Sequence, residues 1–329
     1  MSGFDNPGIS YTDAFIPEEN AENFDSNTNS TISEFKDFIL RFQNMGLEFV
    51  YRNQLKHNYN LKKYFLSINI EDLSCFKENL SDKLIENPSV YLPLFETAAL
   101  QAADEITHPR PLGDEIIQNI QILLSWSCNP YPIREIKSNR VSKLVKISGV
   151  IVSVSAVRMK SVSMTIQCRS CRTTIPNIKI KSGMDSHSLP RKCPSSVSGA
   201  NPLGNRPQCP LDPFFVVPEK CTCVDSQIIK LQEMPDATPT GEMPRHVQLY
   251  CDRNLVECVV PGNKITVIGI YSIKKGFSKR ETVVNAGVGI RKPYLRVIGI
   301  EHSQGESILG KSSIHSSAGV HFSPNEIEE

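Results

Sequence analysis

Six of the ten cysteines gather in the middle of the chain, at spacings that could bind a metal ion. Cys168 and Cys171 form a CxxC pair, whose tight turn can direct two thiolates at one ion. Cys193 and Cys209 follow singly. We expect these four residues to bind one structural zinc ion, because four sulfur ligands leave no coordination position open for catalysis.

Two further cysteines keep an alternative ligand set open. Cys221 and Cys223 are spaced CxC, so on a strand they share a face but lack the turn that closes around a metal. Either one could replace Cys193 or Cys209. A thioredoxin-like redox pair is disfavoured because no βαβ unit surrounds the CxxC pair. His187 lies in the same stretch, but no HxxxH or CxxH spacing supports it as a ligand.

Basic residues lie beside these cysteines. Arg169, Arg172, Arg191 and Lys192 could offset the negative charge of a zinc ion held by four thiolates, or they could reach a phosphate. Both interpretations remain open. The segment from Cys168 to Cys209 is also so short that it needs a metal ion to keep a stable fold of its own.

Charge is segregated along the chain although the formal net charge is only +1. Residues 131–192 contain only Glu135 and Asp185 as acidic residues, and residues 263–296 contain only Glu281. The first third of the chain is instead predominantly acidic. The two basic blocks predict a surface for a polyanion, and the acidic third predicts a separate face for a protein partner.

The basic blocks supply the candidate contacts to nucleic acid. Aromatic residues are few in these blocks, which favours contact with phosphates over stacking on bases. The expected DNA-binding residues are Arg158, Lys160, Lys274, Lys275, Lys279 and Arg280, together with Arg245, which lies between the two blocks.

The elements that position these residues begin with a helical region. Residues 1–30 contain no Lys or Arg and predict a mobile acidic tail. From Ser33 onward, apolar residues recur at the spacing of an amphipathic helix. Further helices are expected at about 72–86 and 88–107, with one strand at 64–70.

After Pro130 the pattern changes to short strands separated by Gly and Pro. The cysteine segment lies between the second and the third strand. We therefore predict a small closed barrel of the OB-fold type, which often binds nucleic acid. The expected strands are 144–152, 163–167, 228–232, 246–250, 264–271 and 294–300.

The expected fold class is α+β and multidomain: a helical subdomain, then an OB-fold barrel with an inserted zinc-binding subdomain. No apolar run is long enough to span a membrane, and the start is not a secretory signal. The expected parts are an acidic tail 1–30, a helical subdomain 31–130, an OB-fold 131–167 and 222–301, a zinc-binding insertion 168–221 and a flexible linker 302–329.

Residues 305–312 match the P-loop pattern GxxxxGK[ST], but we read them as linker. A working P-loop needs a helix after it and a parallel sheet behind it. The residues that follow are poor helix formers, and few of them remain. A free NTPase is therefore disfavoured.

The order of these parts resembles the minichromosome maintenance (MCM) family of replicative helicases. The resemblance rests on GEMPR at 241–245, PGNKITVIGIY at 261–271 and the inserted CxxC unit, and it runs from residue 1 to about 300. Four further stretches resemble one subunit class in particular: the opening MSGFDNPGISYTDAF, CRSCR at 168–172, CPLDP at 209–213 and YCDR at 250–253.

The resemblance implies that the intact protein is one of six different subunits in a nuclear ring that unwinds DNA with ATP and Mg²⁺. Such a ring acts in origin licensing, initiation and fork unwinding during the cell cycle, with other MCM subunits and replication factors as partners. Within it this chain would be the DNA-binding N-terminal collar. The segment from Gln232 to Pro244 matches the loop that reports between collar and motor, so Gln232, Glu233, Gly241 and Glu242 are the expected inter-domain residues. Residues 274–280 match the channel hairpin.

The chain departs from the family because it stops before the expected AAA+ ATPase domain. Alone it should therefore be inactive as an ATPase, and no catalytic residue is expected. A stand-alone single-stranded DNA-binding protein with an OB-fold and a zinc ribbon is the alternative.

Overall fold

The computed structural model describes residues 18–43, 48–108, 118–180, 183–184, 189–190, 192–193, 209–274 and 292–302, with side chains from residue 28 onward. The chain divides into two compact units. One is built around the helices before Trp126, and the other around the large sheet that follows. Within the described residues, no helix is long and apolar enough to cross a membrane.

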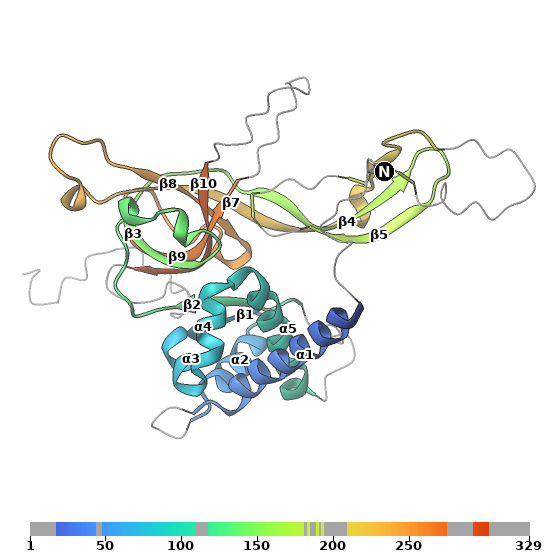
Figure 1. Ribbon diagram of the computed structural model, residues 1–329, viewed down its shortest axis with the longest axis horizontal. Coiled ribbons are helices and arrows are strands. Elements are labelled where there is room, and N and C mark those ends of the chain that lie inside the picture. Colours follow the sequence, from blue (N-terminus) through green and yellow to red (C-terminus); the bar gives the residue numbers. More distant parts are fainter. Residues whose placement is uncertain are drawn as a thin grey trace, which may run out of the picture. The chain divides into compact units, whose positions relative to one another are not determined.

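The first unit packs helices around a short two-stranded parallel sheet (Figure 1). Strand β1 pairs with β2 in register from Phe65↔Gln121 to Asn69↔Ser125. The elements are α1 (Glu18–Arg41), α2 (Val50–Asn60), β1 (Phe65–Asn69), α3 (Ile70–Phe76), α4 (Glu78–Glu86), α5 (Pro88–Thr107) and β2 (Gln121–Ser125).

The apolar stripe predicted from Ser33 onward forms the core of this unit. Phe35, Phe38 and Ile39 are fully buried, and the ring of Phe35 stacks on that of Phe95 in α5 at 4.2 Å between centroids. The predicted helix at 88–107 and the strand within 64–70 are both present. The aromatic spacing therefore reflects packing and not ligand binding.

Three features of this unit differ from the sequence prediction. Helix α1 begins at Glu18, so residues 18–30, expected to belong to a mobile tail, are helical. Acidic residues in the first turn favour a helix because they interact well with the helix dipole. The single helix expected at 72–86 is broken at Lys77, whose backbone is extended. Helix α2 and strand β2 were not anticipated.

The second unit is built on one large sheet that closes on itself at one end. Its strand order is β3-β9-β10-β8-β7-β4-β5, and an additional β3–β7 pairing closes the first five strands into a barrel. The strands are β3 (Leu144–Val154), β4 (Arg158–Cys168), β5 (Thr174–Lys179), β6 (Phe214–Val216), β7 (Thr222–Gln232), β8 (His246–Asp252), β9 (Lys264–Ile273) and β10 (Pro293–His302).

Glycine permits the barrel to close. Gly149 lies where β3 meets β7, and a Cβ at this position would collide with the carbonyl oxygen of Gln232. A buried ion pair, Lys146 Nζ to Glu301 Oε2 at 2.8 Å, also connects β3 with β10. All six predicted strands are present, but the one expected at 163–167 lies in β4, outside the five strands that close the barrel.

Two of the predicted strands are longer than expected, and their extensions pair with each other as an antiparallel ribbon (Figure 1). The strands expected at 163–167 and 228–232 extend to 158–168 in β4 and 222–232 in β7. The far end of β4 pairs with β5 and with β6, neither of which was anticipated. The cysteine segment is thus mounted on a ribbon continuous with the barrel.

Candidate zinc centre and basic pocket

The structure brings the four predicted cysteines together. Cys168 ends β4, and Cys171 lies in the turn that follows, closed by the Arg172 amide donating to the Cys168 carbonyl at 3.0 Å. Arg172 has a positive φ of 59°, which reverses the chain at this point. Cys209 precedes β6, whose first residue, Phe214, pairs with Cys168.

The four sulfur atoms lie within 4.8 Å of one another. Cys168 Sγ is 3.8 Å from Cys209 Sγ, and Cys171 Sγ is 3.4 Å from Cys193 Sγ. A tetrahedral zinc ion with bonds of about 2.3 Å separates its sulfur ligands by about 3.8 Å. The donor set and its spacing therefore fit a closed, structural zinc site.

The cysteine cluster is partly enclosed by its own small apolar core. Cys168 and Cys193 are buried together with Ile166 and Phe214. Desolvation by burial, with hydrogen bonds to the other three thiols, raises the pKa of Cys209 to about 12. A raised pKa favours the protonated thiol, whereas a bound dication favours the thiolate.

The alternative ligands lie apart from this cluster. Cys221 Sγ donates to the Val217 carbonyl at 3.1 Å, and Cys223 is exposed with its sulfur 3.5 Å from Ser161 Oγ. Neither belongs to the four-sulfur group. Among the neighbouring cations, Arg169, Arg172 and Lys192 are exposed. Arg191 and His187 lie outside the described residues.

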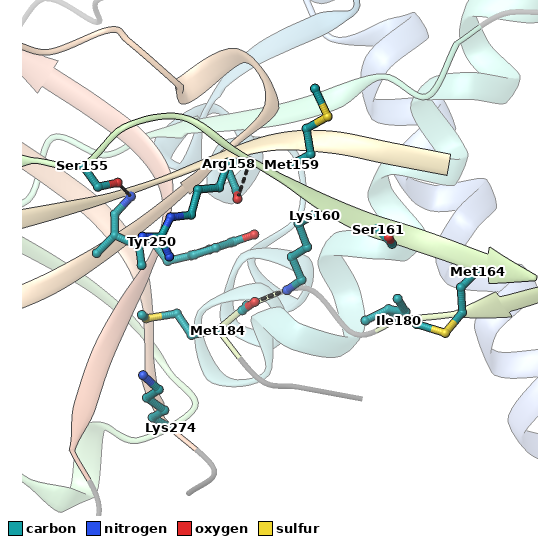
Figure 2. A pocket seen from close by; sticks show the side chains of 13 residues that line it. Ser155, Arg158, Met159, Lys160, Ser161, Met164, Ile180, Met184, Tyr250 and Lys274 are labelled. Carbon is teal, nitrogen blue, oxygen red and sulfur yellow. Dashed lines mark hydrogen bonds between the residues drawn. The ribbon is translucent and has the colours of Figure 1, made fainter. Parts of the chain in front are cut away.

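A basic pocket of about 480 Å³ lies where the barrel joins the insertion (Figure 2). The register of strands β4, β7 and β8 places several side chains together at the base of the pocket, because alternate residues of a strand share a face. Arg158 on β4 pairs with Ser226 on β7, and Ile228, two residues further on, pairs with Tyr250 on β8. All four side chains line the pocket.

Three of the predicted DNA-binding residues line this pocket: Arg158, Lys160 and Lys274. Arg158 and Lys274 are exposed, whereas Lys160 is half-buried. The Lys160 ammonium lies 5.0 Å from the centre of the Tyr250 ring and donates a hydrogen bond to the Gly183 carbonyl. Burial raises the pKa of Tyr250 to about 12, so its hydroxyl is neutral at physiological pH.

Arg245, a further candidate cation, does not line the pocket. Arg245 is exposed and lies at the start of β8, where its amide donates to Glu233 at 3.3 Å. Lys275, Lys279 and Arg280 lie outside the described residues. The Lys274 amide donates to the Lys292 carbonyl at 3.1 Å, so the chain leaves and re-enters the sheet at one place.

The predicted inter-domain loop is fastened by an arginine that the sequence did not indicate. Arg134 Nε lies 2.9 Å from both carboxylate oxygens of Glu233, whose side chain is only 2% exposed. The same guanidinium donates to the Glu242 carboxylate and, at 3.1 Å, to the Met243 carbonyl. Hydrogen bonds to Glu242 and Glu233 raise the pKa of Arg134.

Gln232 and Gly241 complete the predicted set of loop residues. Gln232 ends β7 and pairs with Val150 and His246. Gly241 has a φ of 87°, and nothing would contact a Cβ at this position, so backbone conformation alone accounts for the glycine.

Comparison with known proteins gives two family matches. The model described as the MCM OB domain matches residues 132–275, and the model described as the MCM N-terminal domain matches residues 33–126. The first match covers the barrel unit up to the end of β9, without β10, and the second lies within the helical unit. This chain belongs to the MCM family.

Individual MCM relatives agree with this assignment. DNA replication licensing factor mcm5-A of Xenopus laevis is 47% identical over 92% of this chain. DNA replication licensing factor Mcm5 of Drosophila melanogaster is 47% identical over 98%, and MCM5 of Arabidopsis thaliana is 34% identical over 100%. The chain spans only 41%, 44% and 43% of these relatives, respectively.

The MCM OB match contains all four clustered cysteines and the fastened loop. Sequence reasoning missed Arg134 and Tyr250 because their partners come from distant parts of the chain. Arg134 and Glu233 are 99 residues apart, and no local spacing predicts such a pair. Met184 was also missed, since an isolated methionine gives no signal for a pocket wall.

Proposed function

We propose that this chain acts as the DNA-binding N-terminal collar of the fifth subunit of the MCM replicative helicase. The observation that carries the proposal is the pairing of an MCM OB barrel with a basic pocket on its surface. The names of the relatives, DNA replication licensing factors, support a role in licensing. Roles in initiation and fork unwinding belong to the same proposal, as a helicase subunit.

In this role a zinc ion on Cys168, Cys171, Cys193 and Cys209 holds the insertion in shape. The approach of the four sulfur atoms supports this assignment. A zinc ion with four sulfur ligands has no position for a reacting water, so its contribution is to folding. The boundaries proposed for the zinc-binding subdomain remain 168–221.

DNA is bound through phosphates. Arg158, Lys160 and Lys274 supply the contacts at the pocket, and Lys275, Lys279 and Arg280 extend them along the segment that follows. Arg245, at the end of the loop that begins at Glu233, adds a further cation. Contacts of this kind set affinity and register without reading sequence.

The loop from Glu233 to Arg245 is the element through which the collar would report to a motor domain. The hydrogen bonds of Arg134 to Glu233 and Met243 support this role. They hold the loop in one conformation, from which a motor domain could displace it. ATP and Mg²⁺ would act in those parts of the relatives that the match does not span. The other partners are the remaining MCM subunits in a hetero-hexameric ring, together with replication initiation and fork factors in the nucleus.

Mixing this chain with the corresponding regions of neighbouring MCM subunits tests the proposal. Mass photometry should detect assemblies larger than any single chain, and their formation should increase affinity for DNA. A chain that binds single-stranded DNA but never associates with MCM subunits would instead be a stand-alone binder.

A further inference from the structure

The loop from Glu233 to Arg245 contains a threonine that none of the roles described above uses. Thr238 lies midway along this loop and is followed directly by Pro239. Protein kinases of the proline-directed class phosphorylate a Ser or Thr hydroxyl that precedes a proline. The sequence has one other pair of this kind, Ser323-Pro324, which lies outside the described residues. Within the described residues, Thr238 is therefore the only candidate.

The chain around Thr238 is open to an enzyme. Thr238 itself is half-buried, and its hydroxyl donates to the Met234 carbonyl at 3.0 Å. Local turns shape the stretch: the Thr238 amide donates to the Pro235 carbonyl, and the Glu242 amide donates to the Pro239 carbonyl, each at 3.2 Å. The residues on both sides of Thr238 are exposed: Pro235, Asp236, Ala237, Pro239, Thr240 and Gly241. The stretch can therefore straighten without breaking the strand pairs of β7 and β8.

Arg134 holds the two ends of this stretch together. Its Nε lies 2.9 Å from both carboxylate oxygens of Glu233, before Thr238, and the same guanidinium binds Glu242 and Met243, after Thr238. A kinase binds its substrate segment in an extended conformation. The turn from Pro239 to Glu242 must therefore open, and Glu242 must leave Arg134, before Thr238 can enter a kinase.

We propose that Thr238 is a phosphorylation site, and that its phosphate releases the Glu242 end of the loop from Arg134. The kinase transfers the γ-phosphoryl group of ATP to Thr238 Oγ1, the hydroxyl proton is lost, and ADP leaves. The esterified oxygen then has no hydrogen to donate to the Met234 carbonyl. The inference goes beyond the proposed function, because both steps can be observed on this chain without DNA or another subunit.

Charge explains why the phosphate opens the loop. A phosphothreonine carries a charge of about −1.5 to −2 at pH 7. The loop already contains three carboxylates, Glu233, Asp236 and Glu242, so the phosphate repels them. It also competes for the Arg134 guanidinium, which binds phosphate as well as it binds carboxylate.

The two carboxylates on Arg134 differ in how firmly they are held. The Glu233 side chain is 2% exposed and contributes both of its oxygens, whereas the Glu242 side chain is 59% exposed and contributes one. Glu242 is therefore the contact that the phosphate breaks. Because the kinase needs the open loop and the phosphate favours it, anchoring on Arg134 and phosphorylation of Thr238 oppose each other.

Phosphorylation in vitro tests the site. The chain should be incubated with ATP and a mitogen-activated protein kinase, a class that requires only the following proline, and the phosphate located by mass spectrometry. We expect phosphate on Thr238 in the natural chain and in Thr240→Ala, the matched control at the neighbouring threonine. Pro239→Ala, which keeps the hydroxyl, should lose most of it. Phosphate on Ser323 or Thr240 but not on Thr238 would overturn the assignment.

A synthetic peptide of residues 232–247 separates recognition from access. It contains Thr238 without Arg134, so it should be phosphorylated faster than the chain. A peptide that the kinase does not modify at Thr238 would refute the site, and so would a modified peptide beside an unmodified chain.

The rate of phosphorylation tests the opposition by Arg134. Arg134→Ala should accelerate the modification of Thr238 about tenfold, the effect of one lost hydrogen bond to a charged group, and bring it close to the rate of the peptide. Arg140→Ala, which removes an arginine outside the loop, should keep the natural rate. An unchanged rate in Arg134→Ala would show that the anchor does not control access to Thr238.

Hydrogen exchange on the phosphorylated natural chain tests the release itself, without any substitution. The Glu242 amide should exchange faster after phosphorylation. The Arg245 amide should change less, because its acceptor Glu233 stays on Arg134. Amides of the paired strands, such as those of Ile229 and Leu249, should not change. A chain phosphorylated at Thr238 with unchanged exchange at Glu242 would contradict the release, and it would leave the proposed DNA-binding function untouched.

Discussion

At the scale of single residues, zinc binding changes the protonation of the clustered cysteines, because the metal binds thiolates and not thiols. Burial and hydrogen bonds to the neighbouring thiols raise the pKa of Cys209. A zinc ion stabilises all four as thiolates. We therefore expect that loss of one cysteine ligand releases the zinc ion, and does not only lower the affinity of the site for zinc.

Substitution of exposed cysteines tests the ligand set. Cys171→Ser should reduce bound zinc to less than about half an equivalent, because three sulfur ligands rarely hold a structural zinc ion. Cys223→Ser is the matched control, since Cys223 is also exposed but lies outside the cluster. Elemental analysis of carefully reduced protein measures the metal. Zinc loss in the Cys223 variant would move a ligand to that position.

Tyr250 predicts a second residue-scale effect. Burial raises its pKa to about 12, compared with about 10 in an unfolded chain, so between these values the folded state holds a proton that the unfolded state has lost. Its contribution to stability is complete below about pH 10 and disappears as the pH rises through about 12.

Tyr250→Phe removes this titration. The free energy of unfolding should then fall less steeply with pH above about pH 10, by up to about 1.4 kcal/mol per pH unit for one proton. Urea denaturation at several alkaline pH values measures the slope. Identical slopes in both proteins would show that the Tyr250 pKa is not raised.

At the scale of elements, barrel closure and loop anchoring depend on contacts between distant segments. Gly149→Ala should destabilise the barrel by about 1–3 kcal/mol, because the added methyl group collides with β7 where the barrel closes. Ser153→Ala, at an exposed position of the same strand, should have little effect. Chemical denaturation followed by circular dichroism compares the two variants, and equal stabilities would contradict the closure.

Hydrogen exchange tests whether Arg134 anchors the loop from Glu233 to Arg245. Arg134→Ala leaves the buried Glu233 carboxylate without its principal partner, so the loop should open more often. We expect faster hydrogen exchange at the amides of Glu242 and Arg245 and a thermal midpoint lower by a few degrees. Arg140→Ala is the control outside the loop. Unchanged exchange in the Arg134 variant would show that the loop is held by other contacts.

The elements also explain what the sequence could predict. The α1 core stripe and the barrel strands follow local periodicity, so they were found. Strand β5 is largely exposed and β6 has three residues, so neither shows a periodic apolar pattern. The four cysteines were predicted from spacing, whereas the Arg134 anchor and the pocket wall at Met184 depend on tertiary contacts that no local pattern encodes.

At the scale of the whole molecule, we propose that the basic blocks serve DNA binding and that the acidic first third serves a protein partner. A single chain engages few phosphates, so we expect it to bind DNA weakly. In a ring, several such surfaces act together through a high effective concentration, and weak single sites then give strong binding. Modest affinity of the isolated chain is therefore compatible with the proposed role.

The salt dependence of DNA binding tests the central claim most directly. Fluorescence anisotropy across several salt concentrations should compare the natural chain with an alanine variant of Lys274, Lys275, Lys279 and Arg280. A control should remove four cations of the helical unit: Arg52, Lys56, Lys62 and Lys63. The first variant should flatten the plot of log affinity against log salt by about 0.7–0.9 per lost phosphate contact, equally for all sequences, and the control should not. An unchanged slope in the first variant would show that this segment does not contact DNA.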